Sequence, residues 1–180
     1  SKRKILWVGN GGKFARNEVE KFIKMGFSVV TSALGRGVVP ESNQMSLGAF
    51  NAVPLIEEFY KTLDLMIVVG SRLRGHETRD MSLKLPHKII QIDIDPDAEN
   101  RTYKTNLFHC GDAKKVLGEL AHRLSNQLST DEEWVNEVAD LKSKIFQDYK
   151  KNLGAYKDFP EIIRKILPEN GKWVRDITIS

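Results

Sequence analysis

Short apolar runs at intervals along the chain predict buried parallel β-strands. The clearest are Leu65–Val69 and Lys88–Ile92, which are continuous and rich in β-branched residues rather than alternating with polar ones. Continuous runs of this length suit strands covered on both faces, as in parallel sheets. Similar runs predict three more strands at Lys4–Val8, Phe27–Thr31 and Leu107–Cys110. We therefore expect an α/β fold built on a mostly parallel sheet.

Apolar residues at helical spacing lie between these runs. A stripe over Phe14–Met25, ended by Gly26, predicts a helix between the first two strands. A second stripe over Ala49–Leu63 predicts a helix before the third strand. Asp112 stands where an N-cap is needed for a helix carrying the apolar positions of Val116–Leu124.

Two connections have no sustained periodicity. Ser32–Gly48 holds three glycines and a proline, which predicts a long loop at the carboxyl edge of the sheet. Ser71–Pro86 is rich in charged residues and is predicted to be at most partly helical.

The character of the chain changes beyond Ser125. Thr130 and Glu133 have capping-box spacing, and a stripe over Trp134–Tyr149 then predicts a helix of about five turns. We expect this stripe to pack on the sheet domain or on a neighbouring domain, because its polar face mixes acids with bases. A short helix over Phe159–Leu167 and a strand over Trp173–Ile179 complete the prediction.

Composition excludes several classes of function. The 180 residues are 41% hydrophobic and 29% charged, with no apolar run long enough to span a membrane. The net charge of +4 is spread among acids, which argues against a nucleic-acid partner. Cys110 is the only cysteine, so no internal disulfide is possible and a reducing cytoplasm is expected. Neither His76 nor His87 has metal-ligand spacing, and we predict no metal site and no catalytic nucleophile.

A glycine-rich turn follows the first predicted strand. Gly9, Gly11 and Gly12 have the spacing G-x-G-G. These glycines would let a phosphate approach the backbone amides at the start of the first helix. A tight turn without a ligand explains the same residues, because the spacing is not that of the dinucleotide-binding motif.

Charged residues follow the third and fourth predicted strands. Asp93 and Asp95 alternate with apolar residues, which predicts that they project from one face at the strand end. A carboxylate there suits a ribose hydroxyl, whereas the alternative is a cap on the following turn. Arg72 would bind a diphosphate or, without a ligand, one of these aspartates.

Six motifs in order give the chain a specific resemblance. They read GNGG, TSALGRGVVPE, SLG, DLMIVVGSRL, KIIQIDIDP and GDAKKVLGEL. Their order and spacing resemble the central domain of thiamine-diphosphate-dependent enzymes of the acetolactate synthase and benzoylformate decarboxylase type. The resemblance covers Arg3 to about Leu124, and the tail Leu167–Ser180 resembles the entry into the domain that follows.

The resemblance implies a Rossmann-like sheet of five to six strands, of the kind that binds NAD or FAD, followed by a helical extension. It divides the chain into a central domain (1–128), a helical linker (129–168) and the start of a pyrophosphate-binding domain (169–180). The partners it implies are the pyrimidine-binding and pyrophosphate-binding domains of the same polypeptide, in a homodimer or homotetramer. The full-length enzyme would bind thiamine diphosphate and Mg²⁺ and act on 2-keto acids or related carbonyl substrates. This chain would hold no catalytic residue and would be inactive alone.

In flavin-binding members this domain holds FAD; another adenine nucleotide such as ADP is a second candidate, and a domain without any ligand is the alternative. Together with the glycine turn, the resemblance and the strand ends give these candidate cofactor-binding residues: Gly9, Gly11, Gly12, Ser32, Gly70, Ser71, Arg72, Asp93, Ile94, Gly111 and Asp112. Asn51–Pro54 replaces the Gly-Met-His-Gly of flavin-binding members, and Arg74–His76 replaces their acidic pair and arginine. We therefore expect weak flavin binding at most.

Two hypotheses from other classes compete with this one. A free-standing nucleotide-binding or regulatory module would explain the same sheet, but the strand predicted over Trp173–Ile179 would then be an orphan edge. A sirtuin-type deacetylase would need a zinc ribbon of four cysteines, which a single cysteine excludes.

Overall fold

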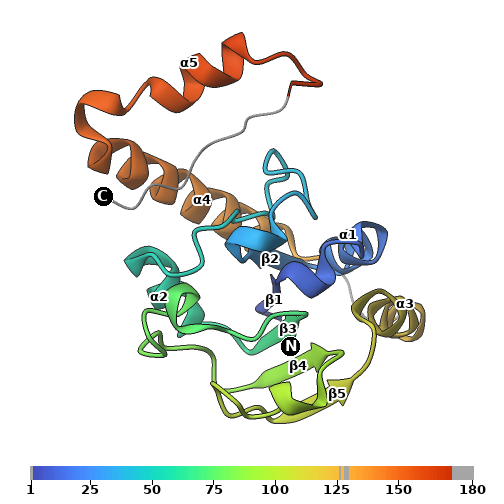
Figure 1. Cartoon of the computed structure of the whole chain (residues 1–180). Coiled ribbons are helices and arrows are strands. Elements are labelled where there is room, and N and C mark those ends of the chain that lie inside the picture. The colour runs from blue at the N-terminus through green and yellow to red at the C-terminus, as the bar shows by residue number, and fades with distance from the viewer. Residues whose placement is uncertain (1, 126, 128–129, 172–180) are drawn as a thin grey trace. The chain divides into compact units, whose positions relative to one another are not determined.

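A computed structural model of the chain describes residues 2–125, 127 and 130–171. The chain divides into two compact units, Ser1–Ile145 and Phe146–Ser180. The first unit holds a parallel sheet in the order β2-β1-β3-β4-β5 (Figure 1). Its strands are β1 Lys4–Val8, β2 Phe27–Thr31, β3 Leu65–Val69, β4 Ile89–Asp93 and β5 Leu107–Cys110. The predicted α/β class is confirmed, as are the five strands predicted between Lys4 and Cys110.

Helices cover both faces of the sheet, as continuous apolar strands require. They are α1 Arg16–Lys24, α2 Pro54–Tyr60, α3 Ala113–Leu124 and α4 Glu132–Asn152. Leu6 and Val8 of β1 pack in one core with α1 and α3, which lie side by side in Figure 1. Ile5 and Trp7, on the opposite face of β1, pack in a second core with α2 and the first part of α4.

Residues 45–48 form backbone hydrogen bonds with β2 at the edge of the sheet. The amides of Val29 and Thr31 donate to the carbonyls of Met45 (2.8 Å) and Gly48 (2.9 Å), and the amide of Leu47 donates to the carbonyl of Val29 (2.8 Å). The segment therefore runs parallel to β2 in the position of a sixth strand. The predicted loop is confirmed, because the connection forms only an isolated parallel bridge between Val29 and Ser46; this pairing depends on β2 and not on local periodicity.

Two predicted helices are shorter than their apolar stripes. Phe14 is 78% exposed and lies before α1, so it does not belong to the buried stripe. The helix predicted from Ala49 begins only at Pro54. Proline suits the first helical position and holds the residue before it, Val53, in an extended conformation (ψ 151°). The predicted cap at Asp112 is confirmed, since its side chain accepts from the amide of Lys115 at 2.9 Å.

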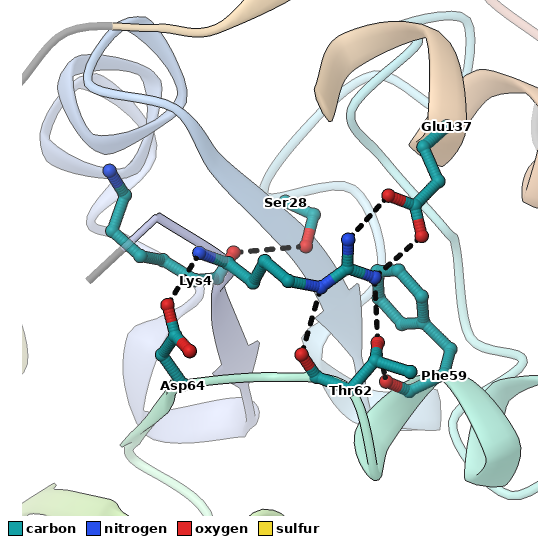
Figure 2. A network of polar contacts seen from close by, with 7 residues as sticks. Lys4, Ser28, Phe59, Thr62, Asp64 and Glu137 are labelled. Atoms are coloured by element: carbon teal, nitrogen blue, oxygen red, sulfur yellow. Dashed lines mark hydrogen bonds and ion pairs between the residues drawn. The ribbon is translucent and has the colours of Figure 1, made fainter. Parts of the chain in front are cut away.

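The first part of α4 is fastened to the sheet (Figure 2). The ring of Trp134 stacks on Phe59 of α2, with centroids 5.4 Å apart and planes 10° apart, and its Nε1 donates to the carbonyl of Gly26 at 2.9 Å. The Arg3 guanidinium lies over Trp134 and donates to both carboxylate oxygens of Glu137 at 2.5 Å. The prediction that this stripe packs on the sheet domain is confirmed.

The start of α4 differs from the predicted capping box. The side chain of Asp131, not Thr130, accepts from the amide of Glu133 at 3.0 Å. The Thr130 hydroxyl instead donates to the carbonyl of Lys24 at the end of α1, at 2.7 Å. The Thr130 side chain thus forms a tertiary hydrogen bond instead of the local bond that a capping box requires.

The second unit contains the end of α4, a 3₁₀ turn at Gly154–Tyr156 and α5 at Phe159–Ile166. Lys150 and Glu161 form an ion pair within it. The strand predicted over Trp173–Ile179 lies outside the described residues. Among the helices that are described, none combines the length and apolarity needed to cross a bilayer.

Candidate functional site

The strand order creates a crevice at one edge of the sheet. The chain leaves β1 for β2 on one side and later returns to β3 on the other. Between strands connected in this way the loops diverge, and ligands of open α/β sheets bind there. A cavity of about 370 Å³ lies at this edge, which is within the usual size range of small-molecule sites.

Most of the predicted residues line this cavity. They are Gly11, Ser32, Gly70, Ser71, Arg72, Asp93, Ile94 and Asp112. The cavity is also lined by residues outside the candidate set, namely Asn10, Leu34, Arg74, His76, Glu77 and Ala113. Asn10, Leu34 and Ala113 lie within two positions of predicted residues in the chain, so the sequence could have indicated them. Arg74, His76 and Glu77 belong to the connection between β3 and β4. The sequence showed that this connection is rich in charged residues but not that it passes beside the cavity.

Three predicted glycines lie behind the cavity wall. A Cβ at Gly9 would lie 2.4 Å from the carbonyl oxygen of Gly70, and one at Gly12 would lie 2.6 Å from Cγ1 of Val8. The amide of Gly111 donates to the carbonyl of Asp93 at 2.8 Å, which extends the pairing of β4 with β5. These glycines allow close packing of backbone at this edge of the sheet.

The amides of the glycine turn are engaged within the protein. Those of Gly9, Gly11 and Gly12 donate to the carbonyls of Val69 (2.8 Å), Gly70 (2.9 Å) and Gly9 (3.1 Å) respectively. A phosphate at this turn would have to compete with these bonds. The geometry favours the tight-turn interpretation of the G-x-G-G spacing over the phosphate cradle.

The carboxylate of Asp93 both faces the cavity and caps a turn. The residue is 7% exposed, lines the cavity and accepts from the amide of Asp95 through Oδ1 at 3.0 Å. Asp95 does not line the cavity, because β4 ends at Asp93 and the alternation stops there. Its own carboxylate accepts from Asp97 (3.0 Å) and pairs with Arg72 at 2.8 Å. Asp95 is therefore the aspartate partner that was predicted for Arg72 in the absence of a ligand.

The segment Asn51–Pro54 does not line the cavity. The side-chain nitrogen of Asn51 donates to the carbonyl of Glu77 at 2.6 Å, and its own carbonyl accepts from the buried hydroxyl of Tyr60 at 3.0 Å. The segment is thus tied to the connection that closes one side of the cavity. Burial raises the pKa of Tyr60 well above its ordinary value, so its hydroxyl stays a donor.

Among the described residues, no group of three or more histidine, cysteine or acidic side chains is arranged to hold a metal ion.

Comparison with known proteins identifies the domain. Residues 1–120 match the family model described as the thiamine pyrophosphate enzyme, central domain. The chain belongs to this family. The thiamine pyrophosphate enzyme central domain thus accounts for two thirds of the chain, including the sheet, the cavity and most of α3.

Similar proteins carry consistent names. The chain is 29% identical to an acetolactate synthase large subunit of Corynebacterium glutamicum, over 86% of this chain and 26% of that protein. It is 27% identical to a probable acetolactate synthase large subunit of Methanocaldococcus jannaschii, over 79% of this chain and 25% of that protein. A probable 2-ketoarginine decarboxylase of Pseudomonas aeruginosa is 26% identical over 79% of this chain and 26% of its own length. The chain spans about a quarter of these relatives.

Proposed function

We propose that the full-length protein is a thiamine-diphosphate-dependent enzyme acting on 2-keto acids or related carbonyl compounds, with this chain as its central domain. The observation that carries the proposal is the family match over residues 1–120, supported by relatives named acetolactate synthase and 2-ketoarginine decarboxylase. Pyrimidine-binding and pyrophosphate-binding domains of the same polypeptide, a homo-oligomeric assembly, Mg²⁺ and a cytoplasmic location belong to this proposal. A free-standing nucleotide-binding module is disfavoured, because the relatives are about four times longer than the matched region.

Thiamine diphosphate, when bound, supplies an electron sink for bond cleavage beside a carbonyl. The contribution of this chain is structural. Its sheet, two apolar cores and the Arg3–Glu137 ion pair would form the scaffold on which the neighbouring domains are placed. We expect no residue of this chain to touch the reacting atoms.

The cavity would hold an adenine nucleotide. Asp93 offers a carboxylate to a ribose, Arg72 lies at the rim for phosphate, and Gly11 and Gly70 line the cavity without side chains. A volume of about 370 Å³ lies near the lower end of ligand sites, which suits a mononucleotide such as ADP better than FAD. The hydrogen bond from the Asn51 side chain to the carbonyl of Glu77 also favours ADP over FAD, because it fixes the segment that replaces the Gly-Met-His-Gly of flavin-binding members.

The enzymatic proposal is tested with the full-length gene product. We expect it to release CO₂ from a 2-keto acid such as pyruvate only when thiamine diphosphate and Mg²⁺ are both supplied. The matched control is the 180-residue chain, which should neither bind thiamine diphosphate in a calorimetric titration nor release CO₂. Micromolar binding by the isolated chain would contradict the assignment of the cofactor to the neighbouring domains.

A further inference from the structure

A second cavity adjoins the first and is lined by arginines. It measures about 300 Å³, and its wall is formed by Arg72, Arg74, Arg101 and Thr102. Arg72 and Arg74 also line the larger cavity, so the two spaces share a wall. The three arginines come from the connections after β3 and β4, which the parallel sheet brings to one edge.

Hydrogen bonds fix these two connections to each other. The Thr102 hydroxyl donates to the backbone carbonyl of Arg72 at 3.0 Å, and Arg72 pairs with Asp95 at 2.8 Å. Between the first two arginines, Leu73 is fully buried with a left-handed backbone (φ 47°). A leucine rarely adopts this conformation, and the burial of its side chain must offset the strain. The backbone from which Arg72 and Arg74 project is therefore anchored.

The charges around this cavity are not balanced. Asp95 neutralises Arg72, but among the residues that the structure describes neither Arg74 nor Arg101 has an ion-pair partner. The wall thus carries two uncompensated positive charges. A phosphate monoester carries about two negative charges at neutral pH, and guanidinium groups bind its oxygens in a bidentate way. Solvated surface arginines would be the alternative, but these three surround one space.

We propose that Arg72, Arg74, Arg101 and Thr102 form a binding subsite for a dianionic phosphate group. Its ligand is a phosphate monoester or diphosphate, and a nucleotide lying in the larger cavity would reach it across the wall of Arg72 and Arg74. The subsite rests on the arginine geometry alone. The nucleoside part of the ligand rests on the proposed function.

The first test is a calorimetric titration of the 180-residue chain with pyrophosphate, at constant ionic strength. We expect saturable binding that weakens as NaCl rises, because exposed charges are screened. The variant Arg74→Gln/Arg101→Gln should bind pyrophosphate at least ten-fold more weakly. Lys21→Gln/Lys144→Gln, which removes the same charge at exposed positions of α1 and α4, should bind like the unchanged chain. No saturable binding, or equal weakening in both double variants, would overturn the subsite.

A second titration separates the subsite from the nucleoside site. ADP should bind at least ten-fold more tightly than adenosine, and the arginine double variant should abolish this difference. If ADP binds and the double variant leaves its affinity unchanged, the nucleotide proposal stands and the subsite is wrong. If pyrophosphate binds as expected but adenosine never does, the subsite stands and the nucleoside site is wrong. Both arginines are exposed, and a thermal melt confirms that each variant is folded.

Discussion

Gly11 and Gly70 meet backbone to backbone where the connections after β1 and β3 diverge. The amide of Gly11 donates to the carbonyl of Gly70 at 2.9 Å, and Gly70 has a left-handed backbone (φ 55°). A Cβ added to Gly70 would lie 2.5 Å from the Cα of Gly11. The floor of the candidate site is thus made of two glycines that exclude any side chain.

Gly70→Ala should therefore destabilise the chain strongly. The left-handed conformation costs an alanine about 1–2 kcal/mol, and the overlap with Gly11 adds on the order of 1–3 kcal/mol. Gly37→Ala is the matched control, because Gly37 also has a positive φ (83°) but has open space around its Cβ position. Urea unfolding of both variants measures the difference. Equal losses would show that the close approach to Gly11 has no energetic consequence.

Trp134 should contribute to the core of the sheet unit. Trp134→Ala removes its stack on Phe59 and should reduce the free energy of unfolding by about 3–5 kcal/mol. Trp134→Phe keeps an aromatic ring but loses the bond to Gly26, which should cost about 1–2 kcal/mol. Tyr156→Ala, at a residue 71% exposed in the second unit, should change stability by less than about 0.5 kcal/mol. A similar small loss for Trp134→Ala would contradict the packing of α4.

Asp64 should make stability depend on acid pH. Its carboxylate accepts from the backbone amides of Arg3 (3.0 Å) and Lys2 (2.8 Å), and these bonds lower its pKa below the ordinary 3.8. Figure 2 shows one of these bonds. The carboxylate therefore stabilises the fold above the pKa of the unfolded chain, and this contribution is lost as pH falls through the lower folded pKa.

Asp64→Asn should accordingly be less stable than the parent at pH 7 and should lose less stability between pH 7 and strongly acid conditions. Glu20→Gln, an equal charge change at an exposed position of α1, should leave the acid slope unchanged. The slope will not vanish, because hydrogen bonds also lower the pKa of Glu57. Thermal melts across the acid range provide the measurement, and parallel curves for Asp64→Asn and the parent would refute the role of Asp64.

Asp93 should determine nucleotide affinity. Asp93→Asn keeps an acceptor for the amide of Asp95 but removes the charge offered to a ribose, so the turn should persist while ADP affinity falls about ten-fold. FAD should bind no better than in the high micromolar range, and the purified protein should be colourless. A yellow protein would contradict the preference for ADP, and unchanged ADP binding by Asp93→Asn would remove Asp93 from the site.

The sequence by itself determined the strands, the cap at Asp112 and the edge of the sheet that carries the candidate site. These features depend on residues close together in the chain. A continuous apolar run suits a buried strand, and an aspartate caps the helix that follows it within three residues. Because parallel strands end at the same edge, Gly11, Gly70 and Asp93 were expected together before their positions were known.

Only the tertiary structure decided the features that depend on distant partners. Segment 45–48 pairs with β2 although its own pattern is that of a loop, and Thr130 leaves its local cap for the carbonyl of Lys24. Arg74 and Arg101 line one cavity because the buried Leu73 turns the backbone between two arginines and because the connections after β3 and β4 are joined. Local propensity carries no information about such contacts, since their free energy comes from packing and hydrogen bonds that form only in the folded chain.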